Sequence, residues 1–132
     1  MDIQVIEETL RETEAGRKTF PECVKALLAA GVESYLVDYA RMEKSSYGVK
    51  GETYTMKMSL PASPVAEAFS KEGLVAAIRG AQRDEIRYPE FVERATAAGV
   101  EAYWAYLTGE RVVYLGRKGE IHVEEFPKAA NH

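Results

Sequence analysis

A chain of 132 residues with 46% hydrophobic and 29% charged residues has the length and composition of one globular domain, which excludes a disordered or fibrous protein. The formal net charge is −4 and acids interrupt each basic run, so we do not expect nucleic acid as a partner. A single cysteine permits no internal disulfide, and no apolar run approaches the roughly 18 residues of a membrane span. We therefore expect a soluble, cytoplasmic protein without a membrane partner.

The first half of the chain is predicted to begin with two helices. Apolar residues recur at helical spacing over 3–10, and this helix should end near Gly16. Thr19 and Glu22 have the spacing of a capping box, which predicts the start of a second helix. That helix should end at Gly31, because glycine adopts the left-handed backbone conformation that closes a helix.

Strands are predicted to follow directly. Residues 32–39 are rich in β-branched and aromatic side chains, which favours a strand. A long connection through 43–46 and a turn at 50–51 lead into a further strand at 52–60. The proline-containing segment 61–64 should link the two halves of the chain.

The second half is predicted to repeat this order. Apolar residues over 74–78 indicate one helix, and a second should run from Pro89 to Gly99. Arg87, which precedes this second helix, has no side-chain oxygen that could cap it. Three strands should follow, at 100–107, 111–115 and 121–126.

The two halves also match residue by residue. Phe20-Pro21-Glu22 returns 68 positions later as Tyr88-Pro89-Glu90, and Ala30-Gly31-Val32 returns as Ala98-Gly99-Val100. A constant offset without gaps predicts a duplicated structural unit. We therefore predict an α+β fold in which helices pack on an antiparallel sheet. The single domain, 1–132, would contain two ααβββ repeats, about 1–60 and 69–128, related by an approximate two-fold axis.

The last strands of the two repeats have opposite patterns. In the first repeat Tyr54 and Met56 alternate with polar residues, whereas in the second Ile121 and Val123 take the apolar positions one residue out of phase. A difference in strand position or a one-residue slip in register would explain the inversion. The other explanation is an exposed apolar face that serves dimerisation or ligand binding.

Tyrosine is unusually frequent, with eight copies, most of them on predicted strands. A tyrosine ring has an apolar body and one polar group, so it suits the edge of a core and also a recognition surface. Both interpretations stay open at this point.

Reactive residues are sparse. His122 and His132 are the only histidines, which leaves no cluster with metal-ligand spacing. The counterpart of Cys23 in the second repeat is Phe91, which indicates an apolar packing position. No phosphate-binding loop, nucleophile elbow or dinucleotide fingerprint is present. We therefore name no catalytic residue, no metal ligand and no cofactor.

Several of these motifs resemble a known family. They are Tyr88-Pro89-Glu90, Ala98-Gly99-Val100, the hairpin from Tyr114-Leu115-Gly116 to Gly119, and the closing Glu124-Glu125-Phe126-Pro127. Together they resemble the YbcV-like family of small bacterial and prophage-associated proteins, sometimes labelled phage envelope proteins. The resemblance covers nearly the whole chain and is strongest over 74–127. It implies an α+β fold and transfers no catalytic residues.

The sequence favours a non-enzymatic binding or protein-interaction module. The candidate binding residues, expected near a cleft between the repeats, are Tyr35, Asp38, Tyr39, Arg79, Tyr103 and Tyr106. The partner would be a protein or a small molecule, and a homodimer is an open alternative. The competing hypothesis is a small enzyme whose acid–base groups come from Glu33, Asp38, Glu101 or Arg79.

Overall fold

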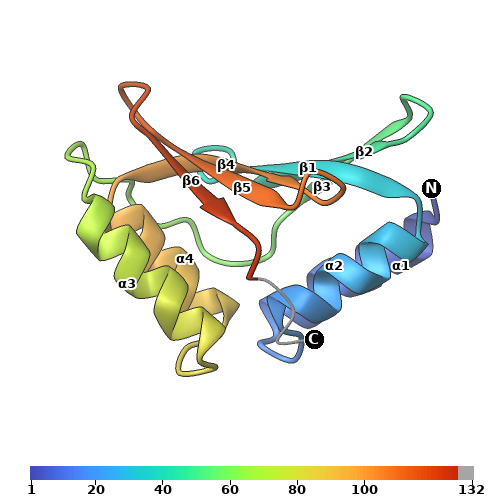
Figure 1. Cartoon of the computed structure of the whole chain (residues 1–132), viewed down its shortest axis with the longest axis horizontal. Helices are drawn as coiled ribbons and strands as arrows, with labels where there is room; N and C mark the ends of the chain where they lie inside the picture. The colour runs from blue at the N-terminus through green and yellow to red at the C-terminus, as the bar shows by residue number, and fades with distance from the viewer. Residues whose placement is uncertain (128–132) are drawn as a thin grey trace.

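The computed structural model describes residues 1–127, and these residues form four helices and six strands (Figure 1). In chain order they are α1 (Ile3–Glu14), α2 (Phe20–Ala29), β1 (Val32–Asp38), β2 (Glu43–Gly48), β3 (Thr53–Lys57), α3 (Lys71–Gln82), α4 (Tyr88–Ala97), β4 (Val100–Tyr106), β5 (Arg111–Gly116) and β6 (Ile121–Glu125). All six strands join one antiparallel sheet in the order β3-β2-β1-β4-β5-β6. The predicted α+β class is confirmed.

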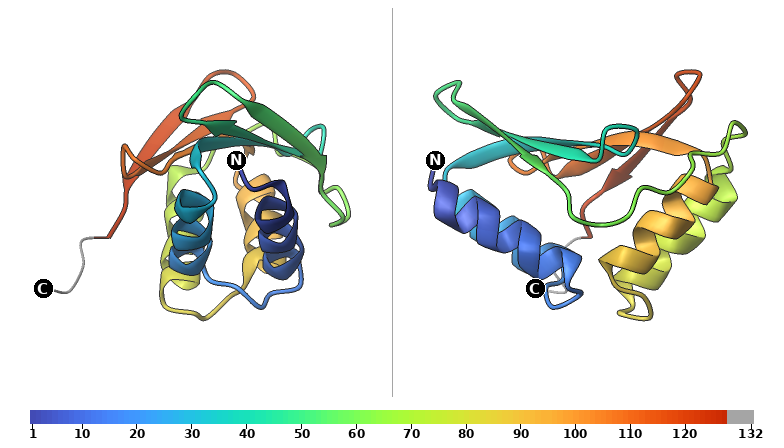
Figure 2. Two further views of the ribbon diagram at one scale, coloured as in Figure 1. Left: turned by 90° about the vertical axis from the view of Figure 1, so that its right-hand side faces the viewer. Right: turned by 180° about the vertical axis from the view of Figure 1, so that it is seen from behind.

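The described helices cover one face of the sheet and leave the other face open. Figures 1 and 2 show α1 and α2 paired below one part of the sheet and α3 and α4 paired below the other part. The core lies between the sheet and these helices. Leu27 of α2 and Leu74 of α3 are fully buried there, as are Val32 and Val100 at the starts of β1 and β4. None of the helices within residues 1–127 has the length and hydropathy needed to cross a bilayer.

The helix ends follow the predicted local chemistry. Thr19 caps α2, because its Oγ1 accepts a hydrogen bond from Glu22 N while the Glu22 carboxylate accepts one from Thr19 N at 2.8 Å. Arg87 precedes α4 and makes no side-chain capping bond. Gly31 and Gly99 follow α2 and α4 with φ of 89° and 93°, so both predicted helix ends are confirmed.

The two halves contain the same elements in the same order, and each element of the second half starts 68 positions after its counterpart, as β1 at Val32 and β4 at Val100 show. β1 pairs with β4 across the middle of the sheet. In that pairing Leu36 lies opposite Trp104, its own counterpart. This is the arrangement that a two-fold relation between the halves requires; the duplication of the sequence itself stays a prediction.

Two predicted connections are wrong. Residues 43–46 belong to β2 and not to a loop, and the actual connection between β1 and β2 is 39–42. The strand pattern was hidden because Lys44 and Ser46, which face the helices, are polar. The strand predicted at 52–60 ends at Lys57, so the link to α3 spans 58–70 and is longer than the predicted 61–64.

Candidate interaction face

The open face of the sheet can be mapped from the strand register, since residues paired across neighbouring strands point to the same side. Three rows cross all six strands in the order β3 to β6. The first is Thr53, Tyr47, Ser34, Tyr106, Arg111 and Glu125; the second is Thr55, Ser45, Leu36, Trp104, Val113 and Val123; the third is Lys57, Glu43, Asp38, Ala102, Leu115 and Ile121. We call these three rows the open face.

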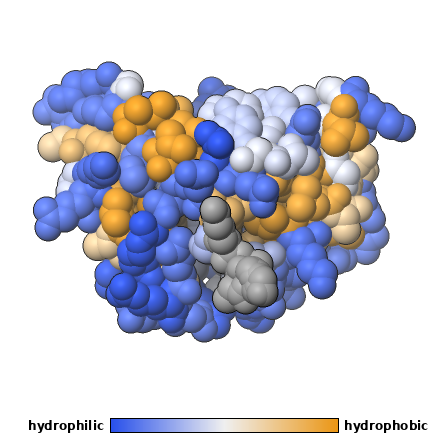
Figure 3. Space-filling model, viewed as in Figure 1, coloured by the Kyte–Doolittle hydropathy of each residue, from blue (hydrophilic) through white to orange (hydrophobic). Residues whose placement is uncertain are grey.

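The open face is polar at one side and apolar at the other. Thr55 and Ser45 occupy the β3 and β2 positions of the second row, and their hydroxyl groups are 2.8 Å apart. From β1 to β6 the same row contains only hydrophobic side chains. At its β6 end Val123 is 45% exposed, and Ile121 in the third row is 61% exposed. In Figure 3 hydrophobic surface lies where Figure 1 draws β6.

Trp104 is the centre of an aromatic group on this face. Its ring stacks on Tyr106, with ring centroids 5.6 Å apart and an interplanar angle of 14°. On the other side of Trp104 lies Tyr47, with centroids 5.1 Å apart. Trp104 is partly buried and Tyr106 is 36% exposed. The group therefore presents aromatic surface beside the aliphatic residues of β5 and β6, an arrangement typical of recognition surfaces.

The exposure of Ile121 and Val123 is not caused by a slip in register. Thr53 pairs with Tyr47, and Ile121 pairs with Leu115, at equivalent positions of β3 and β6. The first explanation of the inverted strand pattern is therefore wrong. The apolar residues of β6 point to the open face because the sequence of this strand differs from that of β3, while the backbone register is the same.

A surface groove of about 490 Å³ adjoins the aromatic group. Glu33, Tyr106 and Arg111 are among the residues that line it, at the turn between β4 and β5. The groove therefore has one acidic and one basic side chain beside the exposed Tyr106 ring. Charges of opposite sign at such a place would favour one orientation of a bound molecule, and apolar surface beside them would supply the area that binding removes from water.

Three of the predicted binding residues lie in the core instead. Tyr35, Tyr39 and Tyr103 point toward the helices and are 4%, 1% and 6% exposed. Tyr88 Oη, at the start of α4, lies 3.3 Å from Tyr39 Oη and 2.9 Å from Tyr103 Oη. Burial raises the pKa of Tyr39, Tyr88 and Tyr103 well above the usual value for tyrosine, so these phenols are neutral. For these positions the structure favours the packing interpretation of tyrosine.

The remaining three predicted binding residues are separated. Asp38 lies on the open face, where its Oδ1 accepts hydrogen bonds from the backbone N–H groups of Ala40 and Arg41 and so closes the turn after β1. Tyr106 lies on the same face beside Trp104. Arg79 lies on α3, below the sheet, and pairs with a carboxylate of β6. The structure thus divides the six predicted residues among three locations.

The groups of the enzyme hypothesis are likewise not assembled. Within residues 1–127 no hydrogen bond or ion pair joins the side chains of Glu33, Asp38, Glu101 and Arg79. The Arg79 guanidinium binds Glu124 at 2.6 Å, which occupies it in a structural pair. No group of three or more His, Cys, Asp or Glu side chains in the described part of the chain could hold a metal ion.

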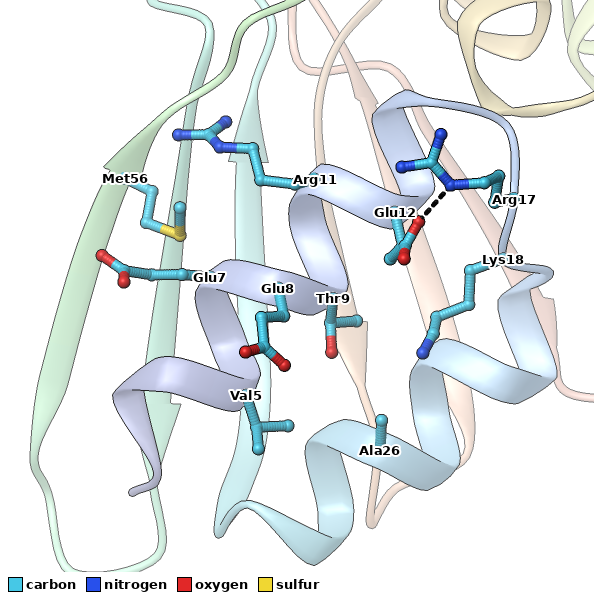
Figure 4. Close-up of a pocket in the computed structure, with 10 residues that line it drawn as sticks. All are labelled: Val5, Glu7, Glu8, Thr9, Arg11, Glu12, Arg17, Lys18, Ala26 and Met56. Carbon is cyan, nitrogen blue, oxygen red and sulfur yellow. Dashed lines mark hydrogen bonds and ion pairs between the residues drawn. The ribbon is translucent and has the colours of Figure 1, made fainter.

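A second groove, of about 580 Å³, lies on the outer surface of α1 and α2 (Figure 4). Acidic and basic side chains alternate around it, and Arg17 Nε pairs with Glu12 at 2.5 Å. Its three acidic and three basic side chains leave it without an excess of either charge. Such exposed pairs contribute little energy, and they provide no concentrated charge that would attract a ligand.

The interior of the first half contains a polar cluster that the sequence did not reveal. Lys44 is 5% exposed, and its Nζ lies 4.1 Å from the centroid of the Tyr35 ring. Cys23 and Ser46 are also buried, and Ser46 Oγ has no hydrogen-bond partner among the described residues. Burial lowers the pKa of Lys44 to about 8. In the second half, Val112 occupies the position equivalent to Lys44.

Trp104, Val113 and Leu115 of the open face were not among the binding residues predicted from the sequence. The signal was present, because a strand whose two faces are both apolar can bury only one face against a single helical layer. No protein-family model matches the chain, and no curated protein matches it. The resemblance to the YbcV-like family therefore stays a prediction.

Proposed function

We propose that this chain is a non-enzymatic interaction module that binds a protein partner through the open face of its sheet. The observation that carries the proposal is the aromatic and aliphatic surface around Trp104, Val113 and Leu115 on a face that no described helix covers. Binding would remove this surface from water, which is the main favourable contribution in most protein association.

The chemistry of the face suits a protein rather than a small molecule. Apolar residues fill the second row from β1 to β6, and in the third row they run from β4 to β6. Among the described residues they form no enclosed cavity, whereas small ligands bind in concave pockets. Polar groups border this surface, with Lys57 and Glu43 at one corner and Arg111 and Glu125 at another. An apolar centre with a polar rim is the usual anatomy of a protein interface.

Site-specific photo-crosslinking in the expressing cell tests the proposal. A benzophenone amino acid replaces Leu36 at the centre of the open face, or Lys25, which is exposed on α2. We expect a crosslinked protein from position 36 and none from position 25. We also expect Trp104→Ser to abolish the position-36 product while the chain stays folded by circular dichroism. The absence of a product at position 36, or equal products at both positions, would refute the proposal.

A further inference from the structure

β6 has a free edge whose backbone groups point away from the sheet. Gly116 N donates to Glu120 O at 2.8 Å and Phe126 N donates to Glu110 O at 2.9 Å, so these positions face β5. Because bonding alternates along an antiparallel strand, the N–H and C=O groups of Ile121, Val123 and Glu125 point outward. β6 lies at the end of the strand order, and no described strand pairs with this side.

The opposite edge of the sheet is protected. Arg11 Nη1, from α1, donates to Lys57 O at 3.4 Å and to Ser59 Oγ at 2.8 Å, and so covers the end of β3. Lys57 itself places a charge at this edge, a common way of preventing strand addition. Arg79 is the counterpart of Arg11, but it binds the Glu124 side chain and leaves the outward carbonyl groups of β6 uncovered.

The side chains of β6 favour the addition of another strand at its free edge. Ile121 and Val123 are 61% and 45% exposed on the open face, and the strand contains neither lysine nor proline. Of its three outward positions only the last, Glu125, is charged. An exposed edge with apolar side chains and unpaired backbone groups is a template for another strand. Figure 1 shows β6 at the front edge of the sheet. The free edge of β6 can therefore pair with an additional strand.

We propose that the added strand is β6 of a second copy, paired antiparallel about a two-fold axis at Val123. In this register Val123 of each copy donates its N–H to the C=O of the other Val123. Ile121 then lies opposite the second copy's Glu125, so both outward positions on either side of the axis are also paired. The two six-stranded sheets become one continuous sheet, with the isologous contact expected of a symmetric dimer.

Charge complementarity selects a second copy as the occupant. His122 and Glu124 point to the helix-covered side, where they lie 3.3 Å apart within one chain. With the axis at Val123, His122 of each copy lies opposite Glu124 of the other, which places a hydrogen-bond donor beside a carboxylate twice. Moving the axis by one residue to Glu124 would place two carboxylates directly opposite each other. On the helix-covered side the sequence of β6 is thus complementary to itself in this antiparallel register.

The backbone edge of β6 lies apart from the centre of the open face around Leu36 and Trp104, so this inference goes beyond the proposed function. A dimer joined through β6 leaves Leu36 and Trp104 on the open face, three and two strands from the new contact. Failure of the dimer would leave the crosslinking result at position 36 unchanged. Failure of that crosslinking would in turn leave the oligomeric state unchanged.

Sedimentation equilibrium of the full chain tests the proposal. We expect the wild type to be a dimer and Val123→Pro to be a monomer, because proline removes an outward N–H that the chain does not use internally. Thr55→Pro is the matched control, since Thr55 holds the equivalent outward position on β3, and it should leave the dimer intact. Circular dichroism confirms that both variants are folded.

A second variant keeps the test decisive if Val123→Pro fails to fold. Val123→Cys places two cysteines opposite each other at a Cα separation of about 5.5 Å, which is within the range of a disulfide. We expect a disulfide-linked dimer under mild oxidation, and none from Thr55→Cys. A monomeric wild type, a Val123→Pro variant that stays dimeric, or equal crosslinking of the two cysteine variants would overturn the proposal.

Discussion

The Lys44 ammonium lies over the face of the Tyr35 ring, 4.1 Å from its centroid, and has no hydrogen-bond partner among the described residues. The contact with the ring is favourable, but it replaces only part of the hydration that burial removes. The lowered pKa of Lys44, about 8, reflects this loss of hydration. The charged form of Lys44 therefore destabilises the folded state.

We predict that Lys44→Met raises the free energy of unfolding at pH 7. In the unfolded chain the lysine pKa is 10.5, so the folded state binds its proton less readily. The penalty is absent above about pH 10.5, grows as the pH falls toward 8, and is complete below 8. Its size is on the order of 3 kcal/mol, because each pKa unit corresponds to about 1.4 kcal/mol. Urea unfolding at pH 7 and pH 10 measures it, and the advantage of Lys44→Met should shrink at the higher pH.

The control for this prediction is Lys25→Met, which changes an exposed lysine of α2. We expect it to alter stability by less than about 0.5 kcal/mol at either pH. A Lys44→Met protein that is less stable than the wild type at pH 7 would show that the contact with Tyr35 outweighs the loss of hydration.

Tyr88→Phe should destabilise the fold. Tyr88 Oη joins the hydroxyl groups of Tyr39 and Tyr103, and its removal leaves two buried hydroxyl groups without this partner. We expect a loss of about 1–3 kcal/mol, measured by thermal or urea unfolding. Tyr114→Phe is the matched control, because Tyr114 is buried and its hydroxyl makes no hydrogen bond within residues 1–127. Equal losses in the two variants would contradict the prediction.

The residues that precede α2 and α4 should contribute differently to stability, because only the one before α2 caps its helix. Thr19→Ala removes the side-chain half of the capping box and should cost about 1 kcal/mol of stability. Arg87→Ala, at the equivalent position before α4, removes no capping bond and only an exposed ion pair with Asp84, so its effect should be smaller. Urea unfolding of both variants compares them, and a larger loss for Arg87→Ala would argue against the capping account.

The two glycines that end α2 and α4 should differ in their tolerance of alanine. Both have positive φ, so either substitution introduces backbone strain of roughly 1–2 kcal/mol. At Gly99 the added Cβ would also overlap the backbone of Ala68 and Phe69, whereas at Gly31 its nearest neighbour is Met1 Cα at 3.6 Å. Gly99→Ala should therefore lower the melting temperature more than Gly31→Ala. Similar decreases in melting temperature for the two variants would show that the 58–70 segment moves to accommodate the added Cβ.

Local patterns predicted the helices and most strands, because those elements depend on signals within a few residues. The capping box of α2 and the helix-closing glycines are examples. The middle strand of the first repeat was expected but misplaced, because residues 43–46 of β2 were assigned to a connection. The sequence of β2, from Glu43 to Gly48, lacks alternating apolar residues. The strand is stabilised by pairing with β1 and β3, and a local sequence pattern cannot predict such pairing.

The candidate site was harder to predict because the direction of a side chain depends on which sheet face the helices cover. Tyr35 and Leu36 are adjacent strand residues, yet the first is buried below the sheet and the second lies on the open face. Both faces of β1 and β4 contain apolar residues, so the pattern alone could not choose. Two sequence features indicated an exposed apolar face, the two apolar faces of β4 and the inverted pattern of β6, but neither identified which face it was.

The pairing of Leu36 with Trp104 also determines how the chain should unfold. β1 with β4 is the one strand pairing that joins the two halves within residues 1–127, so separating the halves strips hydrogen bonds from the two central strands at once. Neither half can lose its structure while the other keeps an intact sheet centre. Heating should therefore produce one cooperative transition, seen at the same temperature in Trp104 fluorescence and in far-ultraviolet circular dichroism.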